Sequence, residues 1–132
     1  MAITIKKTLS ENDVIEIHEM ILSESIGLPG FCESRPLVSA LKRIDNHIAY
    51  DYVSDIYEVA ALYAIAIACG HTFNDGNKRT AMVSMVTFLI LNGIRLMALN
   101  EEIEDIIVEV AEKKVDKKKL AEWIKAHSSI DA

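Results

Sequence analysis

Two apolar stretches dominate the middle of this sequence, and a strongly polar decapeptide separates them. Residues 59–69, VAALYAIAIAC, and residues 81–91, AMVSMVTFLIL, carry apolar side chains at almost every position. A helix that is apolar on every face has to be buried on every face. Both stretches are well short of the about 20 residues that cross a bilayer. We therefore expect them to form the centre of a soluble helical bundle, with no membrane contact.

Start and stop signals predict further helices around this centre. Ser10 is a good N-cap with Asp13 in the first turn, and Asn92-Gly93 is a stop signal. The expected helices cover about 10–25, 34–50, 54–69, 77–91, 100–114 with Asn100 as cap, and a sixth after the cap Asp116. Residues 94–98 are expected to be a short extended segment. The fold class is therefore all-α, a compact bundle of about six helices in which a central apolar helix hairpin flanks the polar segment.

Composition restricts the class of protein. The chain has 132 residues, of which 51% are hydrophobic and 26% charged. These values predict one globular domain over residues 1–132. A net charge of −6 argues against direct nucleic-acid binding through a basic surface. The N-terminus lacks a signal-peptide layout, so a cytoplasmic location is expected. Of the two cysteines, Cys69 is expected to be a small buried apolar residue.

One histidine outside the decapeptide receives a separate interpretation. His18 lies within the first predicted helix, whose apolar stripe is expected to run through Val14, Ile17, Ile21 and Leu22. Because Glu16 and Glu19 flank it, His18 is expected to lie on the surface.

The polar decapeptide HTFNDGNKRT, residues 71–80, places Gly76 and Asn77 at the start of the fourth helix. A helix N-terminus presents unpaired N–H groups and a partial positive charge, so it attracts anions and phosphates above all. Lys78 and Arg79 add two cations in the first turn, which is the unfavourable end of the helix for them. Their presence makes sense if an anion binds between them and the backbone N–H groups.

Two further side chains of the decapeptide suit phosphate chemistry. Asp75 beside a phosphate site is suited to holding Mg²⁺, and His71 is suited to accepting a proton near neutral pH. Phe73 is expected to anchor the loop in the core. The alternative is an ordinary polar interhelical turn. The segment is not a P-loop, and a zinc site is disfavoured because no second histidine or cysteine lies near His71 and Asp75.

HTFNDGNKRTA resembles the signature of the Fic/Doc family, HxFx[D/E]GN[G/K]R, and is most similar to its death-on-curing (Doc) branch. The resemblance extends to further segments in order and spacing: GLPG at 27–30, SRPLVSALKRIDNHIAY at 34–50, DIYEVAALYAIAIACGH at 55–71 and LNG at 91–93. It implies a Fic-type fold and the transfer of part of a nucleoside triphosphate to a hydroxyl group of a target protein.

The resemblance also implies roles for individual residues. His71 matches the general base, Asp75 the metal-binding acid, and Phe73 the buried aromatic anchor. The phosphate-holding positions are matched by Gly76, Asn77 and Arg79. The segment Gly27, Leu28, Pro29 and Gly30 is a possible flap that holds the target by its backbone; a plain interhelical turn is the alternative for it.

Two departures from the adenylyl-transferring members favour phosphate transfer. Lys78 replaces the second glycine of GNGR, and Met82 stands where those members have a second arginine. Doc-branch members share the lysine, which implies a reversed nucleotide, ATP as co-substrate with Mg²⁺, and transfer of the γ-phosphate to a threonine of elongation factor Tu, which stops translation. The alternatives are an adenylyl transferase and a non-catalytic growth inhibitor that binds the ribosome or another partner.

Regulation is expected to come from a second protein. The inhibitory motif [S/T]xxxE[G/N] of some Fic proteins is absent, because Val59 follows the pair Ser54 and Glu58. The resemblance therefore implies a type II toxin–antitoxin (addiction) module. Its antitoxin is disordered when free, folds as a helix into a groove on the toxin, and also binds operator DNA.

Overall fold

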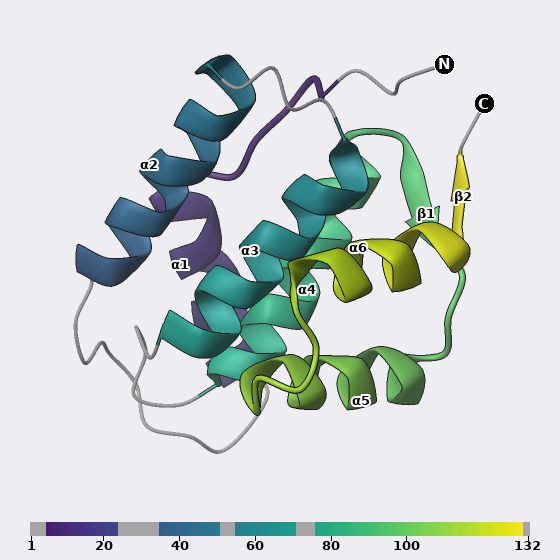
Figure 1. Cartoon of the computed structure of the whole chain (residues 1–132). Coiled ribbons are helices and arrows are strands. Elements are labelled where there is room, and N and C mark those ends of the chain that lie inside the picture. The colour runs from purple at the N-terminus through teal and green to yellow at the C-terminus, as the bar shows by residue number, and fades with distance from the viewer. Residues whose placement is uncertain (1–4, 24–34, 51–54, 71–75, 131–132) are drawn as a thin grey trace.

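Six helices and a two-stranded sheet make up the part of the chain that the computed structural model describes, residues 5–23, 35–50, 55–70 and 76–130 (Figure 1). In chain order they are α1 (Glu11–Ser23), α2 (Arg35–Tyr50), α3 (Ile56–Gly70), α4 (Asn77–Leu91), β1 (Ile94–Leu96), α5 (Asn100–Ala111), α6 (Lys117–Ala126) and β2 (Ser128–Ile130). The prediction of an all-α bundle of about six helices is confirmed.

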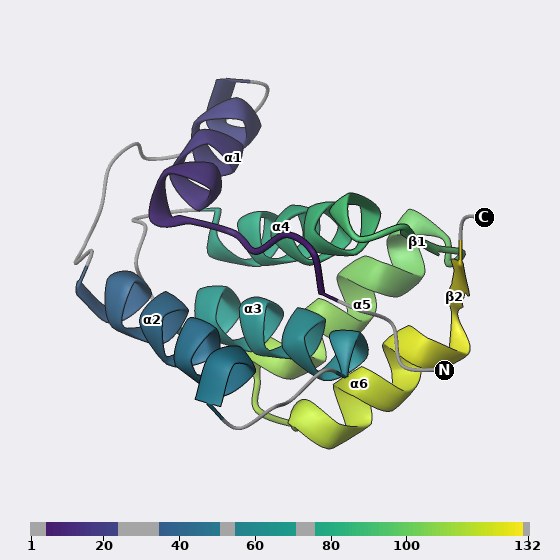
Figure 2. The same ribbon diagram turned by 90° about the horizontal axis from the view of Figure 1, so that it is seen from above.

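Helix α3 lies at the centre of the bundle. It packs against α2, α4, α5 and α6, and Figure 2 shows it enclosed by α2, α4 and α6. Ala60, Ala61 and Ala64 are completely buried, and their short side chains let neighbouring helices approach closely. The central apolar hairpin of α3 and α4 is thus confirmed. No helix in the described ranges is both long and apolar enough to span a bilayer.

The predicted helix ends are mostly correct. The Ser10 Oγ accepts from the Asp13 N–H at 3.2 Å, and the Asp13 carboxylate accepts from the Ser10 N–H at 2.8 Å, a reciprocal cap. The Asp116 carboxylate accepts from the Lys119 N–H at 2.9 Å. Gly93 ends α4 with a φ of +82°, which glycine adopts without steric cost.

The fifth helix differs from its prediction at both ends. Its N-cap is Leu99, with Asn100 already helical, and the Glu102 carboxylate accepts from the Leu99 N–H at 3.1 Å. The helix ends at Ala111, not near Lys114, because Lys113 adopts a left-handed φ of +62°. The Lys114 N–H then donates to Glu109 O at 2.9 Å, which closes a Schellman-type end without the usual glycine.

The extended segment after α4 is shorter than predicted and has a partner that sequence reasoning missed. Strand β1 covers residues 94–96 and pairs antiparallel with β2, with Ile94 opposite Ile130 and Leu96 opposite Ser128. The two strands lie beside each other (Figure 1), and β1 packs against α4. This pairing holds residues 128–130 against the segment that follows α4.

Two buried polar side chains hold the N-terminal segment against the central hairpin. The Asn92 side chain accepts from the Lys6 and Lys7 N–H groups at 2.7 and 3.0 Å and donates to Lys7 O at 2.9 Å. The Tyr63 hydroxyl accepts from the Leu9 N–H at 3.0 Å, and burial raises the pKa of Tyr63 to about 12. The chain just before α1 is therefore fixed on α3 and α4, which sets the position of α1 itself.

Candidate active site

The predicted site lies where α3 ends and α4 begins. Gly70 is the last residue of α3, and Gly76 and Asn77 begin α4. His71, Phe73 and Asp75 fall in residues 71–75, outside the described residues, and so does the possible flap at 27–30. Their predicted roles stay predictions. The four remaining candidates, Gly76, Asn77, Lys78 and Arg79, are all described and are consecutive.

Gly76 caps α4 in a left-handed conformation, with φ +80° and ψ 15°. Internal hydrogen bonding of the helix starts with the Thr80 N–H, which donates to Gly76 O at 2.9 Å. The Lys78 and Arg79 N–H groups in the first turn consequently have no intrahelical acceptor. The conformation, more than a shortage of room, calls for glycine: a Cβ on Gly76 would meet its nearest atom, the His18 Cδ2, at an ordinary 3.5 Å.

We expect Gly76→Ala to lower the free energy of unfolding by about 1–2 kcal/mol, the cost of placing a Cβ in the left-handed region. Chemical denaturation measures this cost. Gly93→Ala is the matched control, because its φ is +82° and nothing lies within 4 Å of a Cβ there. Equal losses in the two variants indicate backbone strain alone. A loss of more than about 3 kcal/mol at Gly76 only would show that the Cβ cannot be accommodated.

The first turn of α4 carries two exposed cations. Lys78 and Arg79 are both solvent-exposed, whereas Thr80 and Ala81 directly after them are completely buried. The helix therefore enters the core immediately after its cationic turn. Met82, at the position of the missing second arginine, packs its partly buried side chain against the core and adds no charge. An anion at this helix end meets N–H groups, a lysine and an arginine.

A histidine outside the motif also belongs to this region. His18 of α1 is only 3% exposed, so the prediction that it lies on the surface is wrong. Its Cδ2 and Nε2 are the atoms nearest to a Cβ position on Gly76, at 3.5 and 3.6 Å, followed by the Leu22 Cδ2 at 3.8 Å. The available signal was spacing, because Val14, His18 and Leu22 follow one another at intervals of four on one face of α1. Glu16 and Glu19 are exposed and lie on other sides of the helix, so their charges do not indicate where His18 lies.

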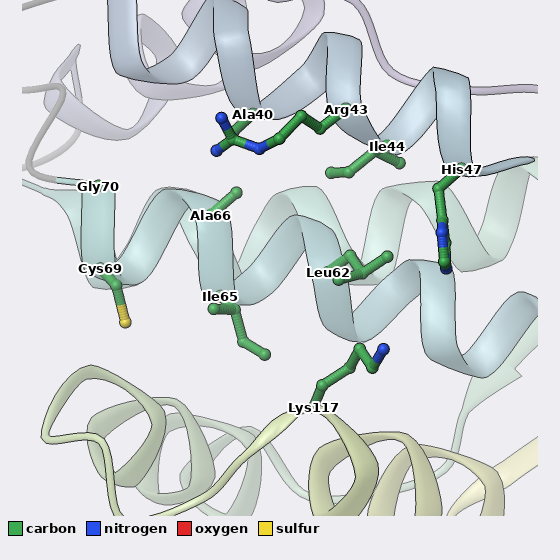
Figure 3. Close-up of a pocket in the computed structure, with 10 residues that line it drawn as sticks. All are labelled: Ala40, Arg43, Ile44, His47, Leu62, Ile65, Ala66, Cys69, Gly70 and Lys117. Atoms are coloured by element: carbon green, nitrogen blue, oxygen red, sulfur yellow. The ribbon is translucent and has the colours of Figure 1, made fainter.

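A groove of about 460 Å³ runs between α2, α3 and the start of α6. Figure 3 shows Gly70 at one end and His47 and Lys117 at the other. Lys117 Nζ lies 2.8 Å from Glu58 Oε1, and its hydrogen bond lowers the pKa of the Glu58 carboxyl. His47 Nε2 is 3.6 Å from the same oxygen. The groove is therefore lined mainly by apolar residues, contains the basic residues Arg43, His47 and Lys117, and has one end directly before the motif.

Cys69 lines this groove. It is partly and not fully buried, and its thiol donates weakly to Val110 O at 3.5 Å. The prediction of a buried apolar cysteine is therefore only partly correct, because α3 leaves this face to the groove.

The donor set fits a nucleotide-bound Mg²⁺ better than a metal held by the protein alone. No group of three or more His, Cys, Asp or Glu side chains gathers to hold a metal within the described ranges, although Asp75 lies outside them. Mg²⁺ commonly takes one or two carboxylates together with phosphate oxygens and waters. The predicted single carboxylate of Asp75, beside a helix end predicted to bind phosphate, would suit that arrangement.

The fold and this helix N-terminus define the class of protein. Residues 8–89 match the model of the Fic/DOC family, and the chain belongs to that family. It belongs to the Doc branch: over 117 residues it is 32% identical to the "Protein kinase doc" of Escherichia phage P1, an alignment covering 89% of this chain and 92% of that protein. It is also 38% identical over 63 residues to the "Toxin Doc" of Mycolicibacterium smegmatis, covering 46% of this chain and 48% of that protein.

Proposed function

We propose that this chain is the toxin of a toxin–antitoxin module and a protein kinase that transfers the γ-phosphate of ATP to a threonine of elongation factor Tu. The observation that carries the proposal is the cationic first turn of α4, where exposed Lys78 and Arg79 stand at an anion-attracting helix end. The similarity to a protein named as a kinase, over nearly its whole length, supports the same reaction class.

The proposed reaction needs little covalent chemistry from the protein. His71 accepts the proton of the threonine hydroxyl while the hydroxyl oxygen attacks the γ-phosphorus. The bond between that phosphorus and the β–γ bridging oxygen breaks, and ADP leaves. Gly76 and Asn77 hold phosphate oxygens through the helix end, and Lys78 and Arg79 stabilise the charge that spreads over the transferring group. Mg²⁺ held by Asp75 would neutralise phosphate charge.

The composition of the first turn supports γ-phosphate transfer over adenylyl transfer. The Lys78 ammonium can pair with a terminal phosphate, and its long side chain occupies the space that a glycine would leave open. Met82 offers no second cation to hold the other phosphates. An adenylyl transferase and a non-catalytic growth inhibitor that binds the ribosome or another partner are the competing functions.

Incubation with elongation factor Tu and ATP labelled at either the γ- or the α-phosphate distinguishes the three functions. We expect label on a threonine of the factor from γ-labelled ATP only. Label from α-labelled ATP would identify an adenylyl transferase. No label from either, in a preparation that still arrests growth when expressed, would indicate inhibition by binding.

The proposal includes an antitoxin partner, which the toxin name of a relative supports. Exposed apolar side chains on neighbouring helices also support a helical partner. Met20 of α1 is 51% exposed, and Ile90 and Leu91 of α4 are 59% and 41% exposed. A shallow groove between α1 and α4 includes Met20 and Leu91. An amphipathic helix that folds on binding would bury these side chains.

A further inference from the structure

One side of the central helix α3 is only partly covered by the rest of the fold. Residues 59–69 of this helix are almost wholly apolar, and a helix that is apolar on every face is expected to be buried on every face. Most of these side chains are buried, but one stripe is only half-buried: Leu62, Ile65, Ala66 and Cys69. The stripe lines the groove of about 460 Å³ between α2, α3 and the start of α6. The volume and apolar lining of this groove are typical of a binding site.

The two ends of the groove differ in charge. Figure 3 shows Ala40 toward the end where Gly70 lies, and His47 at the opposite end. At the His47 end the cations face a carboxylate of the protein itself: Lys117 Nζ and His47 Nε2 lie 2.8 and 3.6 Å from Glu58 Oε1. Their charges are therefore already balanced within the fold, and that end offers little to an outside anion.

Arg43 is the cation that belongs to the Gly70 end. It is exposed and lines the groove. Figure 3 shows its side chain extending toward Ala40, in the direction of Gly70, as expected because helical side chains lean toward the helix N-terminus. Within the described ranges no carboxylate pairs with its guanidinium. The whole chain has a net charge of −6, yet this end combines an apolar surface with an unbalanced cation, which suits an apolar ligand that carries an acid.

The position of the groove indicates which ligand this is. Gly70 directly precedes His71, the predicted base, and the acceptor hydroxyl has to come within about 3 Å of that base. Residues next to the acceptor in the target chain must then lie close to Gly70. The stripe from Ile65 to Gly70 is about 8 Å long at 1.5 Å per residue, which matches two or three residues of extended chain at about 3.3 Å each.

A nucleotide suits this end of the groove less well. Its phosphates are already assigned to the first turn of α4, where Lys78 and Arg79 supply the positive charge. The remaining nucleoside part is uncharged and would leave the guanidinium of Arg43 without an anion.

We propose that the Gly70 end of this groove binds the segment of the target protein beside its threonine, with an apolar side chain of the segment on Ile65 and Ala66 and an acidic one paired with Arg43. The inference rests on the proposed function, since it takes a protein hydroxyl as the acceptor and His71 as the base. Arg43 then selects the target, while the transfer chemistry stays with the motif.

The test compares Arg43→Glu and Ala66→Leu with the wild-type protein. Arg43→Glu replaces an attraction for the acidic side chain by a repulsion, and Ala66→Leu fills part of the groove without changing charge. Labelled transfer from γ-labelled ATP should show the KM for elongation factor Tu raised about tenfold in each, with kcat within about twofold of wild type. The Kd for ATP and Mg²⁺, measured by calorimetric titration, should also stay within about twofold.

Lys42→Glu is the matched control. Lys42 precedes Arg43 in α2 and is also exposed, but it does not line the groove. We expect this variant to keep the wild-type KM for the factor. If it raises that KM as much as Arg43→Glu does, overall charge and not the groove is responsible, and the inference is overturned. It is also overturned if either folded groove variant keeps the wild-type KM. If Ala66→Leu does not fold, Arg43→Glu alone decides.

Two other occupants would give different results. An Arg43→Glu protein whose Kd for ATP rises as much as its KM for the factor would place the nucleotide in the groove. A wild-type dimer that Arg43→Glu converts to a monomer, measured by sedimentation, would place a second copy of the chain there. Either result overturns the inference.

Growth arrest separates the failure of this inference from that of the proposed function. Wild-type protein that arrests growth but does not label elongation factor Tu contradicts the kinase proposal. The inference is then decided by expression of the variants at equal protein levels: Arg43→Glu should lose growth arrest and Lys42→Glu should keep it. Labelling of the factor by wild type, with an unchanged KM in Arg43→Glu, contradicts the inference alone.

Discussion

His71→Ala is expected to lower the rate of phosphate transfer to elongation factor Tu about 10²–10⁴-fold, the usual contribution of a general base. Without the imidazole, the threonine hydroxyl has no positioned group to accept its proton as the oxygen attacks. Because His71 is assigned to the target hydroxyl and not to the nucleotide, the KM for ATP should change little. Single-turnover transfer from γ-labelled ATP measures the effect.

The matched control for this variant is His47→Ala. His47 belongs to α2 and lines the groove at the end opposite Gly70 (Figure 3). It has no assigned role in transfer. The His47→Ala variant should retain the wild-type kcat. A His71→Ala protein that transfers phosphate at the wild-type rate, or that still arrests growth fully when expressed, would contradict the assignment of the base and the enzymatic function with it.

Lys78→Ala is expected to lower γ-phosphate transfer about 10²–10³-fold, comparable with removal of one preorganised group that stabilises transition-state charge. The same substitution should raise the free energy of unfolding slightly, although it lowers activity. Lys78 is exposed in the first turn of α4, where a cation opposes the helix dipole by about 0.3–1 kcal/mol. Removing the charge should therefore stabilise the fold slightly while activity falls. Labelled transfer and chemical denaturation measure the two effects.

Lys118→Ala is the control for this variant. Lys118 is also an exposed lysine in the first turn of a helix, α6, so its replacement should give the same small gain in stability with no loss of transfer. If Lys78→Ala loses stability and activity together, Lys78 supports the fold instead of the reaction. If it keeps full γ-transfer, the argument for phosphoryl over adenylyl transfer fails.

Features encoded within a few residues were predictable. The mutual cap of Ser10 and Asp13, the Asp116 cap and the Gly93 stop each depend on hydrogen bonds between residues three positions apart. The motif at 71–80 identified the candidate site and the family for the same reason. The end of α5 was predicted three residues too late. Lys113 ends the helix in a left-handed conformation, a position where glycine is usual, so the sequence contains no stop signal there.

Features that join distant parts of the chain were not predictable. Strands β1 and β2 are three residues each and lie more than thirty positions apart, and neither carries an alternating pattern long enough to indicate a sheet. His18 was placed on the surface because its sequence neighbours are acidic, yet neighbours in sequence lie on other faces of a helix.

The sequence by itself determined the central apolar hairpin, most helix ends and the residues of the motif, because burial periodicity and capping act over one or two helical turns. Only the tertiary structure decided what packs against the motif. The His18 ring lies 3.5 Å from the place that a Cβ on Gly76 would take, although the two residues are 58 positions apart. Asn92 and Tyr63 bind the chain before α1, and α1 packs against α4.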